Sequence, residues 1–195
     1  PYKGKYKMGW DNLREQRFKK QKELGVIPEN TKLSPRHPDV LAWADAPDKA
    51  WEQRRMEVYA AQLSVMDRGI GRIIESLKKT GRYENTLIFF TVDNGACAVE
   101  HEKKRKGTFL PLKTRSGQPM YPGNDPKVMP GPENTYQSYG INWANASNTP
   151  YRQFKKYDHE GGIKTPMIAH WPAKIAKGGR IIQEPAHLVD IFPSI

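Results

Sequence analysis

Asp93 and Asn94 are the first candidates for chemistry, because they end a short apolar run that stops at Gly95. Residues 86–92 read T-L-I-F-F-T-V without alternation, which is typical of a strand buried on both faces of a parallel sheet. Ligands of open α/β sheets bind beyond the carboxyl ends of the strands. A carboxylate and an amide oxygen at that edge suit a hard cation. Asn-Gly is also a common turn dipeptide, so these residues are equally compatible with a plain turn.

A long helix over residues 48–81 must position this strand. Its apolar residues recur at spacings of three and four, from Met56 to Leu77, and form one stripe. Asp48 is a suitable N-cap and Gly81 a suitable C-cap. We expect Gly69 and Gly71 to pack closely against the sheet. Helix, turn and strand together are the α-to-β half of a βαβ unit.

The segments on either side of this helix and strand are expected to cover a core. Residues 1–47 are broken by Gly and Pro, contain a short helix from Asp11 to Leu24, and pack their aromatic side chains on a core built by other segments. Residues 96–150 are expected to form a long loop that lies over a site, and the aromatic side chains of the loop are expected to keep it ordered. Within it, the basic cluster at residues 103–106 is expected to be solvated.

Residues 151–195 predict a second strand and a further helix. Gly161 and Gly162 mark a tight backbone approach. Residues 163–171 are expected to be a strand, and Pro166 indicates an edge position, a bulge or the start of the strand. His170 is expected to be packed and hydrogen-bonded. His187 is expected to help begin a helix at residue 188.

The net charge of +11 favours anionic partners or substrates. Residues 1–36 hold ten Lys/Arg and four Asp/Glu, a difference of +6, but no zinc-finger spacing or stacking-aromatic motif accompanies them. We therefore expect no nucleic-acid partner. No run of about 18 apolar residues predicts a membrane span. The single cysteine, Cys97, excludes an internal disulfide and is expected to be buried or structural.

Five motifs in order resemble a type I, arylsulfatase-like sulfatase of the alkaline phosphatase superfamily. They are A-A-Q-L-S-V-M-D-R-G-I-G-R-I-I, V-D-N-G, W-A-N-A-S-N-T-P, H-E-G-G-I-K-T-P and H-L-V-D-I-F-P. No single motif is strong, but their order and spacing together are specific. The resemblance implies an α/β, alkaline-phosphatase-like fold with a largely parallel or mixed sheet flanked by helices. It also implies that the protein hydrolyses sulfate esters and that its substrate is a sulfated small molecule or a sulfated glycan.

The resemblance also implies roles for individual residues. Asp93 and Asn94 match the pair that supplies two oxygen ligands to Ca²⁺ in this family. Lys155, five residues before Glu160, matches the lysine that holds the sulfate, although Lys156 is adjacent. His159 is expected near the bound substrate. Without the motif, Lys155 would be interpreted as a solvated lysine of a basic chain.

The family's formylglycine nucleophile comes from C-x-P-S-R, which C-A-V-E-H-E around Cys97 does not match. We therefore expect residues 1–195 to be the central to C-terminal part of a catalytic domain, with the nucleophile region and a small C-terminal domain outside it. Alone, this segment is expected to be inactive and to fold poorly. A periplasmic or secreted location is favoured by the resemblance. Two alternatives stay open: a phosphoesterase of the same superfamily, and a non-catalytic module that binds polyanions.

Overall fold

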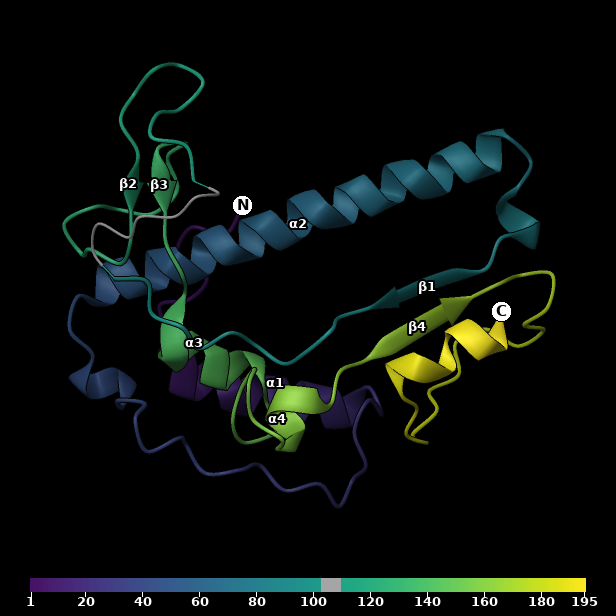
Figure 1. Cartoon of the computed structure of the whole chain (residues 1–195). Helices are drawn as coiled ribbons and strands as arrows, with labels where there is room; N and C mark the ends of the chain where they lie inside the picture. Colours follow the sequence, from purple (N-terminus) through teal and green to yellow (C-terminus); the bar gives the residue numbers. More distant parts are fainter. Residues whose placement is uncertain (103–109) are drawn as a thin grey trace.

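The computed structural model describes residues 1–102 and 110–195, so the basic cluster at 103–106 lies outside the described residues. The helices are α1 (Gly9–Glu23), α2 (Lys49–Lys79), α3 (Gly140–Ser147) and α4 (Glu160–Ile163). The strands are β1 (Ile88–Thr91), β2 (Tyr121–Pro122), β3 (Thr135–Tyr136) and β4 (Met167–His170). Helix α2 runs along the molecule, with α1, α3 and α4 gathered at one end and β1 and β4 toward its C-terminal end (Figure 1).

The core lies where α1, α2 and α3 meet, and its centre is aromatic. Trp10 of α1 is 1% exposed and Trp143 of α3 is 0% exposed, with ring centroids 5.3 Å apart in an edge-to-face arrangement. Met56 from α2 belongs to the same buried cluster. The prediction that aromatics of residues 1–47 pack on a core is confirmed. They do more than cover it, because Trp10 lies at its centre.

Helix α2 follows the predicted helix closely, but its details differ from the expectation. Asp48 occupies the N-cap position with φ of 48° and makes no side-chain cap hydrogen bond. The apolar stripe is buried at Met56, whereas Ile73 is 62% exposed. A Cβ added to Gly71 would meet nothing within 4 Å. The expected close packing of the helix glycines against a sheet is therefore wrong for the described chain.

Strand β1 pairs with β4 in an antiparallel register from Ile88 opposite His170 to Thr91 opposite Met167. The predicted second strand is thus confirmed, shortened to Met167–His170. Within the described residues β1 has no parallel neighbour, and Phe90 is 38% exposed, so burial on both faces is not observed. Helices with small sheets agree with an α/β composition. The complete alkaline-phosphatase-like sheet stays a prediction.

The segment predicted as one long loop, residues 96–150, contains α3 and the short parallel pair β2–β3. An ion pair between the buried Arg55 and the exposed Glu100 attaches this segment to α2. The Arg55 guanidinium lies 2.9 Å from the carboxylate of Glu52 on its own helix and 2.8 Å from that of Glu100. Since an unpaired buried charge is costly, these contacts fix the chain soon after β1 against the core.

The C-terminal segment forms two 3-10 turns, Leu188–Asp190 and Phe192–Ser194, in place of the expected helix. His187 begins the first turn as predicted, accepting a hydrogen bond from the Val189 amide, while Asp190 caps the His187 amide in return. His170 packs against the Tyr83 ring at 5.1 Å, but its Nε2 has no hydrogen-bond partner among the described residues. The expected hydrogen bond of His170 is therefore wrong.

None of the helices in the described part of the chain combines the length and apolarity that crossing a membrane requires.

Candidate functional site

The turn after β1 and the loop before α4 meet through their backbones. The Gly95 amide donates to the Gly162 carbonyl oxygen at 2.9 Å, and the Lys155 amide donates to the Ala96 carbonyl oxygen at 3.1 Å. These two bonds bring the residues just after Asp93 and Asn94 against the loop that carries Lys155. The structure therefore places two parts of the predicted site, far apart in sequence, side by side (Figure 1).

Glycines allow this close approach. A Cβ added to Gly95 would lie 1.7 Å from the Gly161 carbonyl oxygen. One added to Gly162 would lie 2.0 Å from the Tyr157 carbonyl oxygen. Both distances are far below any van der Waals contact, so a side chain on Gly95 would force the two segments apart and one on Gly162 would displace the loop before α4. The tight approach predicted for Gly161 and Gly162 is confirmed.

Two threonines fasten the end of β1 to the start of β4. The Thr165 hydroxyl donates to the Val92 carbonyl oxygen at 2.8 Å, and the Thr91 hydroxyl donates to the Pro166 carbonyl oxygen at 3.2 Å. Pro166 has no amide hydrogen, which is consistent with its place just before β4. These bonds extend the strand pair up to the residue before Asp93.

Asp93 is exposed and Asn94 is half-buried. The Asn94 Nδ2 donates to the Gly95 carbonyl oxygen at 2.8 Å, so Oδ1 is the end of that amide available as a ligand. No hydrogen bond or ion pair engages the Asp93 carboxylate within the described ranges. This donor pair suits a hard cation, which prefers oxygen ligands.

The pair is only part of a cation site. Ca²⁺ takes about six to eight oxygen ligands, more than Asp93 and Asn94 provide. Residues 1–102 and 110–195 hold no cluster of three or more acidic, histidine or cysteine side chains that could bind a metal ion. Any cation here therefore needs ligands in addition to these two residues.

The lysines near the site differ in their environments. Lys155 is exposed, and no described residue forms a hydrogen bond or ion pair with its ammonium. Lys156 is exposed as well, and its φ of 85° lies in the left-handed region. Lys164 instead lies 3.4 Å from the Glu160 carboxylate. Burial lowers the pKa of Lys164, but the Tyr151 hydrogen bond and the Glu160 carboxylate outweigh burial and raise it.

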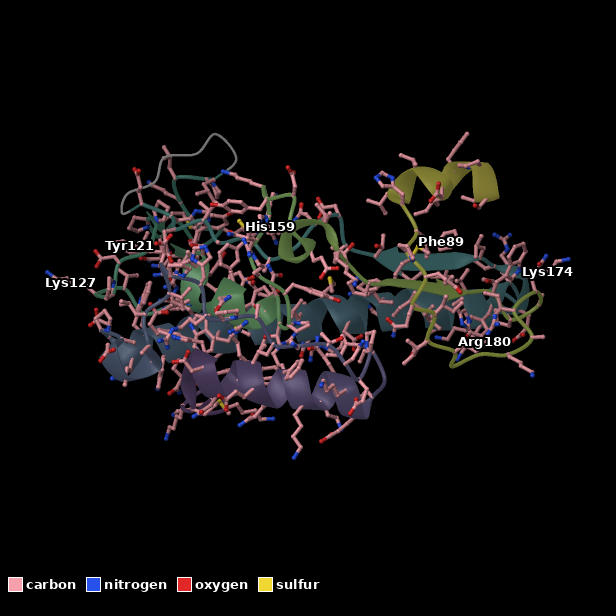
Figure 2. All side chains as sticks on the ribbon, turned by 90° about the horizontal axis from the view of Figure 1, so that it is seen from below. Phe89, Tyr121, Lys127, His159, Lys174 and Arg180 are labelled. Atoms are coloured by element: carbon pink, nitrogen blue, oxygen red, sulfur yellow. The ribbon has the colours of Figure 1, made fainter. Side chains whose placement is uncertain are left out.

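His159 lies on the exposed side of this region, directly before α4 (Figure 2). Its Nε2 is 2.9 Å from the Arg152 Nη2. Because a guanidinium only donates, the His159 Nε2 is the acceptor of this bond. The predicted substrate contact of His159 is not tested by this geometry.

Cys97 follows the turn and is exposed, so the prediction of a buried or structural cysteine is wrong. The Ala96 amide and carbonyl are both hydrogen-bonded, which holds the backbone immediately before Cys97. Its thiol therefore lies at the surface of a well-anchored turn.

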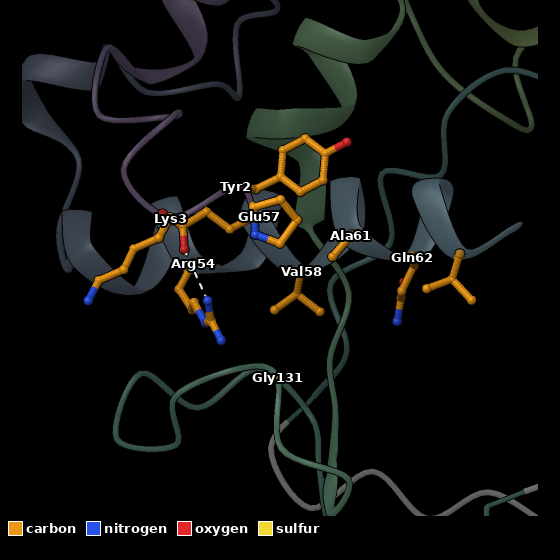
Figure 3. A pocket seen from close by; sticks show the side chains of 10 residues that line it. Tyr2, Lys3, Arg54, Glu57, Val58, Ala61, Gln62 and Gly131 are labelled. Carbon is orange, nitrogen blue, oxygen red and sulfur yellow. Dashed lines mark hydrogen bonds and ion pairs between the residues drawn. The ribbon is translucent and has the colours of Figure 1, made fainter. Parts of the chain in front are cut away.

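A surface cavity of about 590 Å³ lies elsewhere, between the first residues of the chain and the N-terminal half of α2 (Figure 3). Its lining includes Tyr2, Arg54, Glu57 and Gly131, and none of the predicted site residues. The Arg54–Glu57 ion pair of 3.1 Å belongs to its wall. The cavity is thus separate from the Asp93 and Lys155 region.

Comparison with known proteins identifies the family. The family profile described as Sulfatase matches residues 2–195. The chain belongs to the sulfatase family. It is 36% identical over its whole length to an uncharacterized sulfatase of Schizosaccharomyces pombe and 32% identical to the arylsulfatase of Klebsiella aerogenes. It covers 34% and 40% of these sulfatases, so it spans about a third to two fifths of their length. The mouse steryl-sulfatase is 27% identical over 70% of this chain, which covers 16% of that sulfatase.

Sequence reasoning missed two residues of this site. Asn148 hydrogen-bonds to both segments that meet here, and Thr165 fastens the strand end. Both lie in motifs that carried the family resemblance, but the sequence alone assigned neither residue a role of its own. The available signal was a polar residue at the end of a largely apolar helix, which usually satisfies backbone groups.

Proposed function

We propose that the protein containing this chain hydrolyses sulfate esters, with residues 1–195 forming the central to C-terminal part of its catalytic domain. The observation that carries the proposal is the backbone junction of Gly95 with Gly162 and of Lys155 with Ala96. It brings the backbone segments that carry Asp93, Asn94 and Lys155 together in a sulfatase-family chain.

Asp93 and Asn94 would hold part of a calcium ion's ligand shell. Bound there, the ion would withdraw electron density from the sulfate ester oxygens. Asp93 supplies a full negative charge and Asn94 a neutral oxygen, so the first contributes more to cation affinity. The fixed Asn94 amide, with Nδ2 engaged by Gly95, presents Oδ1 without reorganisation.

Lys155 would neutralise a sulfate oxygen. Transfer of a sulfuryl group spreads negative charge over its oxygens, as phosphoryl transfer does, so a positioned ammonium stabilises the transition state. The bond from its amide to Ala96 fixes the start of the side chain relative to the Asp93 turn. His159 would turn its Nδ1 edge to the substrate while its Nε2 accepts from Arg152.

The nucleophile belongs to another part of the protein in this proposal. Cys97 lies in C-A-V-E-H-E, which is not the C-x-P-S-R pattern from which formylglycine is made. The substrate would be a sulfated small molecule or a sulfated glycan. The relatives named arylsulfatase, steryl-sulfatase and N-acetylgalactosamine-6-sulfatase illustrate that range. A periplasmic or secreted location belongs to the same proposal.

The test uses the full-length protein with 4-nitrophenyl sulfate and 4-nitrophenyl phosphate, each with Ca²⁺ and with a chelator. We expect sulfate hydrolysis that the chelator abolishes. Preference for the phosphate ester would instead establish the phosphoesterase alternative. Hydrolysis of neither, with tight binding to a sulfated polysaccharide, would establish the polyanion-binding alternative.

A further inference from the structure

The side chain of Asn148 bridges the two segments that form the candidate site. Its Oδ1 accepts a hydrogen bond of 2.9 Å from the Ala96 amide. Its Nδ2 donates to two carbonyl oxygens, those of Gln153 and Gly161, each at 2.8 Å. One amide group thus makes three bonds, and the partners dictate its orientation because an N–H needs an acceptor and a carbonyl a donor.

Asn148 is itself firmly held. It directly follows α3, and its amide donates to the Ala144 carbonyl oxygen at 3.0 Å. The nearby α3 residues Trp143, Ala144 and Ala146 are all 0% exposed. The Asn148 carbonyl oxygen in turn accepts from the Tyr151 amide at 2.8 Å. The side chain therefore transmits the position of a rigid core helix to both segments.

We propose that Asn148 is a positioning residue that sets the Lys155 loop relative to the Asp93–Asn94 turn. Its acceptor end holds the turn at Ala96, and its donor end holds the loop at Gln153 and Gly161. The proposed catalytic roles of the residues on each side rest on the proposed sulfatase function. The bridge itself consists of hydrogen bonds that can be tested without activity.

The two ends can be separated by one substitution. Asn148→Asp keeps an oxygen for the Ala96 amide but loses both donors and sets a carboxylate against two carbonyl oxygens. In the full-length protein, we expect KM for 4-nitrophenyl sulfate to rise about tenfold, the equivalent of one or two ordinary hydrogen bonds. We expect Ca²⁺ affinity not to weaken. Asn148→Ala removes both ends and should weaken Ca²⁺ binding and raise KM together.

Residue-resolved hydrogen exchange gives a readout that needs no activity. In Asn148→Asp the loop loses both donor bonds, so the Gly161 amide, which donates to the Arg152 carbonyl oxygen within the loop, should exchange about tenfold faster, while the Ala96 amide stays protected. In Asn148→Ala both amides should exchange faster. The matched control is Asn142→Asp, which makes the same change of charge on α3 and should leave KM and both exchange rates unchanged.

Two results would overturn the proposal. One is Asn148→Asp with unchanged exchange at Gly161, which would show that the donor bonds do not hold the loop. The other is equal acceleration at Ala96 and Gly161 in that variant, which would indicate a general loss of stability. If the unsubstituted protein hydrolyses no sulfate ester, the sulfatase proposal fails, and the exchange measurements still decide the role of Asn148.

Discussion

The Gly95 amide donates a 2.9 Å hydrogen bond to the Gly162 carbonyl oxygen, and this bond connects the end of β1 with helix α4. Gly95 permits this bond because it has no side chain: a Cβ there would lie 1.7 Å from the neighbouring Gly161 carbonyl oxygen. The geometry of the candidate site therefore depends on backbone contacts as much as on the side chains that would do chemistry.

Gly95→Ala should separate the two segments. The new methyl meets a backbone oxygen rather than a flexible side chain, so the chain must shift, at a cost of about 1–3 kcal/mol or more. Denaturant unfolding of the full-length protein and KM for 4-nitrophenyl sulfate measure the effect. The control is Gly71→Ala in α2, where open space predicts a gain of up to about 1 kcal/mol. Equal effects at both glycines would contradict the close approach.

The sequence predicts the elements better than their partners. The period of apolar residues located α2, because a helix of 31 residues repeats its signal many times. The apolar run at 86–92 located β1 but not its neighbour, since strand pairing is set by segments distant in sequence. The antiparallel partner β4 therefore differed from the parallel sheet that an unbroken apolar run favours.

The site shows the same division. Family motifs pointed to Asp93 and Lys155, and the structure brings their segments together. No periodicity points to Asn148, because its role depends on three backbone groups that only the folded chain brings within reach. Exposure of Cys97 was missed for a related reason: the residues before it are fixed by hydrogen bonds to the backbone and not by burial.

Asp93→Ala should abolish Ca²⁺ binding at this site, and Asn94→Ala should weaken it. Removing the carboxylate eliminates a charged ligand, whereas removing the amide eliminates one neutral contact. Elemental analysis of the purified full-length variants measures the calcium content. An Asp93→Ala protein that retains stoichiometric calcium would show that another oxygen cluster binds the ion.

Glu57 should contribute to the free energy of unfolding at neutral pH, and this contribution should be lost in acid. Burial raises the pKa of this carboxyl, but hydrogen bonds from Gln53, the Gly4 amide and Arg54 outweigh burial and lower it. Figure 3 shows the contact with Arg54. A folded-state pKa below the unfolded one means that the folded protein binds fewer protons. The stabilisation is therefore present above the ordinary glutamate pKa and is lost as pH falls through the folded one, from about pH 4.5 downward.

Glu57→Gln should lower the free energy of unfolding at pH 7 by about 1–3 kcal/mol and flatten its decline in acid. The measurement is denaturant unfolding of the full-length protein between about pH 3 and pH 7, a range that contains the ordinary glutamate pKa. Glu23→Gln is the control, since its ion pair with Lys20 is exposed and contributes little. An unchanged slope in Glu57→Gln would contradict the prediction.

Residues 1–195 expressed alone should be inactive and should melt broadly. Ile73 of α2, Phe90 of β1 and Ile168 of β4 are 62%, 38% and 60% exposed, which leaves apolar surface without cover. We expect this segment to bind a hydrophobic dye and to hydrolyse no 4-nitrophenyl sulfate. A sharp cooperative melt together with turnover would refute the expectation.

Lys155→Ala should lower kcat/KM for 4-nitrophenyl sulfate. The expected loss of transition-state stabilisation is about 2–4 kcal/mol, comparable to removing one oxyanion donor. Its ammonium would meet sulfate oxygens in the ground state and more strongly in the transition state, so KM should rise and kcat should fall. Lys155→Arg should rescue poorly, because a planar guanidinium differs in reach and shape from a compact ammonium.

Lys156→Ala is the matched control, because Lys156 is the adjacent exposed lysine of the same loop. Steady-state kinetics of the full-length variants should show little change for Lys156 and a large change for Lys155. If Lys156 is the sensitive residue, the assignment by spacing from Glu160 is wrong by one position. If neither lysine matters, this loop does not hold the sulfate, even though its backbone is bonded to the turn at Ala96.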